Sequence, residues 1–224
     1  VAIIADAAHS FGATYFGRPI GGIADFTCFS FHVLKPITTG GEGGAVVWQD
    51  FYAFDNERLE RRLRLLGDHG QTGKGERGVH GREWEYDISL FGYNHIMTDV
   101  DAAVGLAQLG RMPEIFNTKS NVTRLYMEFL PGCVEPALNH NGDNYESSMH
   151  LFPVRIPGAG ENERNAVFAK MLDAGIQCNV HYKPLPMFTA YIREGFDIED
   201  YPVAYETYKS LITLPYHNGL TIND

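Results

Sequence analysis

A carboxylate, a hydroxyl and an amine stand near the start of the chain, close to segments that are typical of β-strands. Asp6 follows the apolar run at residues 1–5, and Ser30 lies in the β-rich segment 23–31, five residues before Lys35. A lysine amine forms an imine with an aldehyde, and a carboxylate keeps a pyridine ring nitrogen protonated. Side chains of these types could therefore hold pyridoxal phosphate (PLP), with the Ser30 hydroxyl directed at its phosphate group.

Parallel β-strands would place these side chains at one edge of a sheet. Residues 1–5 are apolar on both faces, as in a buried strand of a parallel sheet, and residues 23–31 and 45–48 are also strand-like. The small residues 7–12 predict a turn into a brief helix. Because α/β sheets bind ligands at the carboxyl ends of their strands, Asp6 is expected at a ligand site.

Helices alternate with a long polar loop in the middle of the chain. The apolar periodicity predicts helices over three ranges: 55–66, 99–109 and 114–130. Asp99 is expected to cap the second helix, and Pro113 to separate it from the third. The glycine-rich range 67–85 is expected to form a long loop, and long loops in compact domains are often functional.

The pattern changes beyond about residue 120, where a further α/β domain is indicated. Four segments are predicted there: a loop at 131–147, a strand at 150–156, a helix at 163–174 and a strand at 176–181. Gly175 is expected to end the helix. We therefore predict two domains, 1–120 and 121–224.

The composition is that of a globular protein without excess positive charge. Of the 224 residues, 44% are hydrophobic and 21% are charged, and the net charge is −10. Such a chain repels a nucleic-acid backbone, and no apolar run reaches membrane-spanning length. The three cysteines are scattered singly and lack metal-binding spacing, which favours a reduced, cytoplasmic protein without a metal. Because Val1 lies directly inside a strand pattern, we interpret the chain as a fragment.

The candidate residues also have structural interpretations. A lysine after a strand is, taken alone, more often a solvated surface residue than a nucleophile. His9 could face the same ligand as Asp6 or be a partly buried histidine. The glycine-rich stretch at residues 38–44 lacks the spacing of a phosphate-binding loop, so we expect it to be a tightly packed turn.

The order of the motifs along the whole chain resembles that of the DegT/DnrJ/EryC1/StrS aminotransferases. The residues that carry the resemblance are Asp6-Ala7-Ala8-His9, Gly12-Ala13, Phe29-Ser30-Phe31-His32 with Lys35, Thr38-Thr39, Glu42-Gly43-Gly44, Gly92-Tyr93-Asn94, Met97-Thr98-Asp99, Ala102-Ala103, Gly175-Ile176, His181-Tyr182 with Pro184, and Leu214-Pro215. Members of this family are fold-type I PLP enzymes that aminate keto-sugars on nucleotide carriers. The resemblance implies an α/β fold like that of aspartate aminotransferase, with a mostly parallel sheet, a smaller C-terminal α/β domain and the N-terminal part of the large domain missing.

The resemblance also implies roles in binding the cofactor. Lys35 matches the lysine that binds PLP and moves protons, and Asp6 matches the partner of the ring nitrogen. His9 matches a residue near the phenolic oxygen, and Ser30 a phosphate ligand. Asn94 matches a residue that reaches the phosphate of the neighbouring subunit, which implies a homodimer with shared active sites.

On the substrate side, the resemblance implies a transaminase that moves an amino group from glutamate to a keto-sugar nucleotide, such as a 4-keto-6-deoxy sugar, in amino-sugar, lipopolysaccharide or glycan biosynthesis. Relatives that dehydrate sugars carry histidine at the position of Lys35. His32, His181 and Tyr182 are the candidate substrate-binding residues. His150 lies in the same region of the resemblance, although all of these side chains could instead pack within a small domain.

Two positions depart from the family pattern and leave alternatives open. Ile96 stands where the family usually has an arginine that could pair with the carboxylate of the amino donor. The glycine pair Gly40-Gly41 stands where a single small residue is typical. The alternatives are a non-catalytic regulatory or degenerate member of the family, and an aminotransferase that acts on a cyclitol or another ketone.

Overall fold

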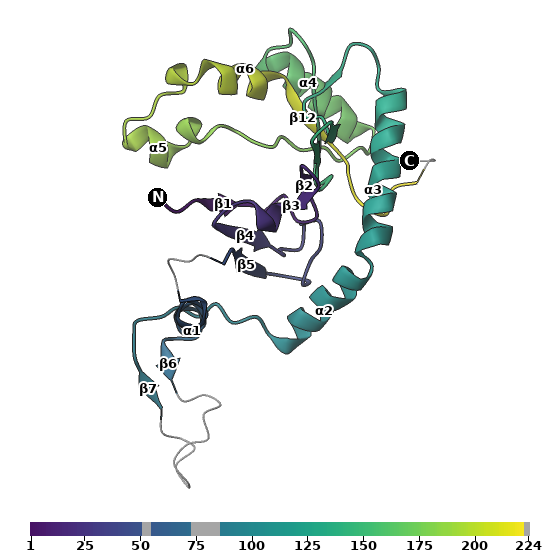
Figure 1. Cartoon of the computed structure of the whole chain (residues 1–224). Coiled ribbons are helices and arrows are strands. Elements are labelled where there is room, and N and C mark those ends of the chain that lie inside the picture. Colours follow the sequence, from purple (N-terminus) through teal and green to yellow (C-terminus); the bar gives the residue numbers. More distant parts are fainter. Residues whose placement is uncertain (51–54, 73–85, 222–224) are drawn as a thin grey trace. The chain divides into compact units, whose positions relative to one another are not determined.

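The fold is that of a computed structural model, which describes residues 1–50, 55–72 and 86–221 (Figure 1). The chain divides into two compact units. The first unit consists of Val1–Ala8 and Ile20–Leu109, and the second unit of His9–Pro19 and Gly110–Asp224. The boundary that the sequence suggested, at residue 120, lies inside helix α3 (Met112–Phe129).

A three-stranded sheet organises the first unit. Its strands, in spatial order, are β1 (Ile4–Asp6), β4 (Phe26–Ser30) and β5 (Gly44–Trp48). Strands β1 and β4 are parallel, whereas β4 and β5 form an antiparallel pair. The other strand pairs of the described residues are also antiparallel, so this chain itself holds little of a parallel sheet.

Strand β1 confirms the predicted strand at the start of the chain but not its predicted burial. Ile3 and Ile4 are 64% and 70% exposed. The cause is position, because β1 lies at the edge of this sheet. The brief helix expected at 7–12 is also absent: those residues form turns, in which the Asp6 carboxylate accepts the Ala8 N–H at 3.0 Å.

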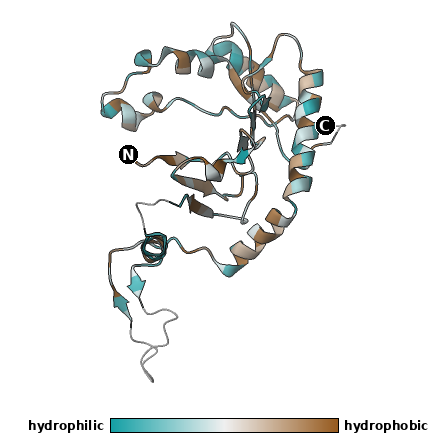
Figure 2. Ribbon diagram, viewed as in Figure 1, coloured by the Kyte–Doolittle hydropathy of each residue, from teal (hydrophilic) through white to brown (hydrophobic). Residues whose placement is uncertain are grey.

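Two helices of the first unit confirm the predicted periodicity. Helix α1 (Asn56–Gly67) begins at Asp55, whose carboxylate accepts the Arg58 N–H. Helix α2 (Asp99–Gly110) is capped by Thr98 rather than by the expected Asp99, because the Thr98 hydroxyl accepts the Asp101 N–H at 3.2 Å. Hydrophobic residues run along most of α2 (Figure 2), and none of its residues is buried.

The loop expected at 67–85 lies only partly within the described residues. Helix α1 extends to Gly67, and a short strand, β6 (Gln71–Thr72), follows and pairs with β7 (Asp87–Ile88). The range 73–85 lies outside the described residues. A single-turn helix, η1 (Ile20–Gly22), completes the first unit.

The second unit has its own hydrophobic core. Its main sheet has the order β12 (Leu211–Leu214), β11 (Phe152–Arg155) and β8 (Glu135–Pro136). Phe152, Val154 and Ile212 form the buried centre, and side chains of α3 pack against it. The strand predicted at 150–156 is found at Phe152–Arg155, but Phe152, Pro153 and Val154 are all buried, so the predicted half-buried alternation is wrong.

The remaining elements of the second unit surround this sheet. They are a small sheet of order β3 (Arg18–Pro19), β2 (Thr14–Tyr15), β10 (Tyr145–Glu146) and β9 (Asn141–Gly142), the helices α4 (Glu161–Asp173), α5 (Thr189–Arg193) and α6 (Pro202–Ser210), and the single turns η2 (Leu185–Met187) and η3 (Ile198–Asp200). Gly175 follows α4 with φ of 81°, as a helix-ending glycine does. Pairing between β2 and β10 explains why His9–Pro19 belongs to this unit.

Two expectations for the second unit are wrong. The range 131–147 contains three short strands rather than loop alone. The strand expected at 176–181 is reduced to one bridge between Asn179 and Thr213. The physical reason is that the side-chain oxygen of Asn179 accepts the Val180 N–H at 2.7 Å, and this local hydrogen bond competes with further backbone pairing to β12. Among the described residues, no helix has both the length and the apolarity needed to cross a membrane.

Candidate functional site

The register of the first sheet places Asp6 and Ser30 on one face of it. Asp6 is paired with Cys28 across the parallel strands, so both side chains point to the same side. Ser30 lies two residues beyond Cys28 and therefore shares that face. Because neighbouring strands lie about 4.8 Å apart and each residue advances a strand by about 3.3 Å, the Cα atoms of Asp6 and Ser30 are roughly 8 Å apart.

Both side chains keep hydrogen-bonding capacity beyond their local contacts. One oxygen of the exposed Asp6 carboxylate accepts the Ala8 N–H, which leaves the second oxygen available. The Ser30 hydroxyl accepts the His32 N–H at 3.3 Å, which leaves its own hydrogen free to be donated. The two strand ends thus present an anionic acceptor and a neutral donor on the same face.

Lys35 lies on the loop that joins β4 to β5. Its side chain is partly buried, and its backbone N–H bonds to the His32 carbonyl at 2.9 Å. The following glycine-rich stretch is a tightly packed turn, as expected: Thr39 is 2% exposed, and its hydroxyl donates to backbone carbonyls. Gly40 has φ of 95°, in the region that favours glycine, so the turn after Lys35 uses one glycine of the pair for its conformation.

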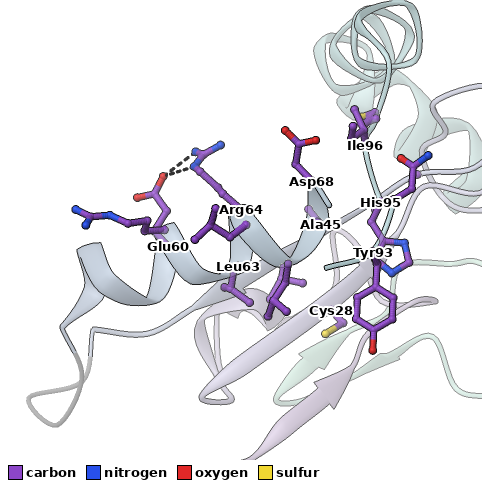
Figure 3. Close-up of a pocket in the computed structure, with 18 of the residues that line it drawn as sticks. Cys28, Ala45, Glu60, Leu63, Arg64, Asp68, Tyr93, His95 and Ile96 are labelled. Carbon is purple, nitrogen blue, oxygen red and sulfur yellow. Dashed lines mark hydrogen bonds and ion pairs between the residues drawn. The ribbon is translucent and has the colours of Figure 1, made fainter. Parts of the chain in front are cut away.

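A cavity of about 1570 Å³ lies beside the sheet in the first unit (Figure 3). Its lining includes Cys28 and Ala45 from the sheet, Arg64 and Asp68 in and just after α1, and the segment at residues 93–97. This segment contains Asn94 and Ile96, so Asn94 lines the same cavity as Cys28 and Ala45 of the sheet. Lys35, Asp6 and Ser30 do not line it.

An ion pair and an aromatic stack lie in the lining of this cavity. Arg64 makes two hydrogen bonds to Glu60, at 2.8 and 2.7 Å, which Figure 3 shows as dashed lines. The ring of His95 stacks on that of Tyr93, with centroids 5.2 Å apart. Ile96 is 55% exposed and adds an apolar surface where the family pattern has a cation.

The second unit gathers His9 with three of the other predicted residues. The His9 ring lies 4.4 Å from that of His150 and 6.2 Å from that of Tyr182, and His181 and Tyr182 are 4.6 Å apart. Burial raises the pKa of Tyr182. The Ser148 hydroxyl also bonds to the His9 carbonyl, and the sequence analysis missed this serine. Its sequence position, two residues before His150, was the one available signal.

A second polar group that the sequence analysis missed lies in the core of the second unit. Lys119 is 5% exposed, and burial lowers its pKa to about 8. Its amine lies 5.7 Å from the ring of Tyr216, whose pKa burial raises to about 12. His140 stacks on the same tyrosine, and burial lowers its pKa. The signal was periodicity, since Lys119 falls within the apolar stripe of α3.

Comparisons with known proteins identify the family of the chain. A profile of the DegT/DnrJ/EryC1/StrS aminotransferase family matches residues 1–224. The chain is 32% identical over 225 residues to the UDP-4-amino-4,6-dideoxy-N-acetyl-beta-L-altrosamine transaminase of Campylobacter jejuni, a match that covers 100% of this chain and 56% of that protein.

Solved structures show the same fold. A candidate sugar aminotransferase of Streptococcus pneumoniae, in its PLP form, aligns with a TM-score of 0.91 and 42% identity over 100% of this chain and 54% of that one. A Helicobacter pylori aminotransferase involved in the biosynthesis of pseudoaminic acid aligns with a TM-score of 0.82 and 25% identity, over 100% of this chain and 56% of that one. The chain thus spans about half the length of the relatives it matches. Because the family profile matches the chain from end to end, the chain belongs to the DegT/DnrJ/EryC1/StrS aminotransferase family.

Proposed function

We propose that the protein is a PLP-dependent transaminase that moves an amino group from glutamate to a keto-sugar carried on a nucleotide. The observation that carries the proposal is the strand register that places Asp6 and Ser30 on one sheet face, with Lys35 on the loop directly after β4. The printed names of the relatives, which describe transaminases of amino sugars, support a sugar as the amino acceptor.

The chemical types of these residues fit PLP. When bound, PLP supplies a protonated ring that withdraws electrons from the carbon losing its proton. The free oxygen of Asp6 would hold the proton on the ring nitrogen, and the Ser30 hydroxyl would donate to the phosphate. The estimated Asp6–Ser30 spacing of roughly 8 Å is comparable with the length of PLP between these two groups. Lys35 would attach to the aldehyde and carry the proton during transfer.

The remaining predicted residues would complete the site. We propose that His9 lies near the phenolic oxygen of PLP, and that His181 and Tyr182 contact the sugar nucleotide. The ring contacts within this group support a shared location. Asn94 is exposed at the cavity of the first unit, which supports a role toward the phosphate of a second subunit in a homodimer.

The amino donor and the cellular location are further proposals. We keep glutamate as the donor, although Ile96 offers it no positive charge, so its carboxylate would bind elsewhere. A cytoplasmic location is supported by the three cysteines, all of which are free thiols.

The test is covalent attachment of the cofactor in the whole natural protein. Purified protein should show the visible absorbance of bound PLP, glutamate should bleach it without any sugar, and borohydride should fix the cofactor on Lys35 as a mass increase. Lys35→Ala should lose all three signals, whereas the exposed control Lys170→Ala should keep them. Wild-type protein that binds no PLP would refute the proposal, and PLP bound without bleaching would favour a non-catalytic member.

A further inference from the structure

The loop that carries Lys35 is tied at both of its ends. The Phe31 N–H bonds to the Gly43 carbonyl at 2.7 Å, and the Val33 N–H to the Gly41 carbonyl at 2.9 Å. Thr39 bonds back to the Phe31 carbonyl through both its N–H and its hydroxyl, at 3.0 and 3.2 Å. These contacts extend the β4–β5 pairing past the strand ends and leave one short turn to set the position of Lys35.

Packing does not hold this turn. Val33 and Leu34, its two central residues, are 50% and 73% exposed. Burial begins only after Lys35, where Ile37 is 4% exposed. Hydrogen bonds must therefore decide the conformation of the turn between His32 and Lys35.

His32 supplies two acceptors for this turn. Its carbonyl accepts the Lys35 N–H at 2.9 Å, and its ring Nδ1 accepts the Leu34 N–H at 3.3 Å. Acceptance by a side chain from the N–H two residues further on is the pattern by which asparagine and aspartate stabilise turns. The imidazole of His32 thus takes the place of an asparagine side chain.

Acceptance at Nδ1 requires a particular form of the ring. A neutral imidazole has one protonated nitrogen, so an accepting Nδ1 leaves the hydrogen on Nε2. Nε2 lies 3.9 Å from a carboxylate oxygen of Glu42, which favours a hydrogen at that nitrogen. Glu42 belongs to the other side of the same loop, where its carbonyl accepts the Thr39 hydroxyl at 2.9 Å.

We infer that His32 is a positioning residue for Lys35, which it holds through the Leu34 N–H while Glu42 keeps the ring in the required form. This inference rests on the proposed role of Lys35. It differs from the substrate-binding role that the family resemblance suggested for His32, because both ring nitrogens already face groups of the loop.

The test compares three variants of the whole natural protein. In His32→Asn the side-chain oxygen can still accept the Leu34 N–H, whereas His32→Gln carries its amide one bond further out and His32→Phe keeps only the ring volume. We expect covalent attachment to Lys35, measured by borohydride reduction and intact mass, to stay near the wild-type rate in His32→Asn. In the other two variants it should fall about tenfold, the effect of one oriented hydrogen bond.

The kinetics of the half-reaction with glutamate provide a second measurement. A displaced Lys35 should lower kcat and leave KM for glutamate unchanged, whereas a substrate-binding His32 would raise KM. Glu42→Gln should lower kcat by no more than a few-fold, because its carboxylate is exposed. If His32→Phe does not fold, the comparison of His32→Asn with His32→Gln still tests whether the side chain must accept the Leu34 N–H.

Three outcomes would overturn the inference: equal rates in His32→Asn and His32→Gln, an effect on KM alone, or a hydrogen on Nδ1 in ¹⁵N NMR of the wild-type ring. None of them touches the proposed function. That proposal fails separately, if wild-type protein binds no PLP.

Discussion

The two units of the chain are built on opposite principles. In the first unit the sheet edge presents polar groups, and large apolar residues such as Ile4 and Val100 are 70% and 74% exposed. In the second unit Phe152, Val154 and Ile212 are at most 3% exposed and form one contiguous core. Hydrophobic burial is the main stabilising term in folding, so we expect the second unit to contribute more of the stability, whereas Asp6, Ser30 and Lys35 of the first unit carry the proposed cofactor chemistry.

The largest expected effect concerns Asp6. Asp6→Asn should lower the rate of the glutamate half-reaction by about 10²- to 10³-fold, because the charge that holds the ring proton is lost. The free energy of unfolding should change by no more than about 0.5 kcal/mol, since Asp6 is exposed and asparagine can still accept the Ala8 N–H. Stopped-flow absorbance and chemical denaturation measure the two quantities.

Asp173→Asn, at the end of α4, is the matched control and should change neither quantity. If Asp6→Asn lowers the free energy of unfolding and leaves the rate unchanged, Asp6 has a structural role and the comparison between the two units is contradicted.

Phe152→Ala tests the other side of the comparison. Removal of this ring, which is 1% exposed, should lower the free energy of unfolding by about 3–5 kcal/mol. Phe91→Ala in the first unit removes a ring that is 99% exposed and should cost less than about 0.5 kcal/mol. Urea denaturation of both variants measures the difference. Equal losses would mean that the apolar surface of the first unit is covered in the natural protein.

Lys119 allows the core of the second unit to be tested by pH. Its pKa is about 8 in the folded chain, compared with an ordinary value of 10.5, so the unfolded chain holds the extra proton between these values. The free energy of unfolding should therefore rise with pH from about 8, by at most about 1.4 kcal/mol per pH unit. Lys119→Met should remove this rise and be at least as stable as wild type at pH 7.

Measurements between pH 7 and 9 stay below the ordinary tyrosine pKa of 10, at which Tyr216 ionises in the unfolded chain, whereas burial raises its pKa to about 12 in the folded chain. Lys170→Met, on the exposed surface of α4, should keep the pH dependence of wild type. If the free energy of unfolding of wild type does not rise with pH relative to that of Lys119→Met, the Lys119 amine is in contact with water and the prediction is wrong.

The buried His140 should have the smallest effect on the free energy of unfolding, and this effect should appear at acidic pH. Burial lowers the pKa of its ring. Below about pH 6.5 the ring is therefore protonated in the unfolded chain while it stays neutral in the folded chain. Wild type should lose stability relative to His140→Phe between pH 7 and 5, by less than about 1.4 kcal/mol per pH unit. Thermal melts would measure the difference, and the exposed His217→Phe should not show it. A constant difference between wild type and His140→Phe would contradict the buried ring.

Local patterns made part of this structure predictable. The strand β11 and the glycine after α4 are properties of short segments, and both are found where expected. The positions of Asp6 and Ser30 at strand ends followed from the same reasoning. Capping was harder, because Thr98 and Asp99 are adjacent and the side-chain geometry decides which of them accepts the helix N–H.

Features that depend on distant pairing could not be read from local patterns. The assignment of His9–Pro19 to the second unit depends on β2 meeting β10, which lies about 130 residues later in the chain. The missing strand at 176–181 depends on an asparagine that takes a neighbouring N–H in the folded chain. The burial of Lys119 depends on α3 meeting Tyr216, which lies 97 residues later in the chain and whose hydroxyl donates to the Lys119 carbonyl.

The sequence by itself determined the types and spacing of the chemical groups, the strand and helix segments and the family, because these depend on residue identity and short-range periodicity. Only the tertiary structure decided which face Asp6 and Ser30 share and which side chains, such as that of Lys119, are buried in the second unit. Those properties arise from strand register and from contacts between segments that are distant in the chain, which no local pattern encodes.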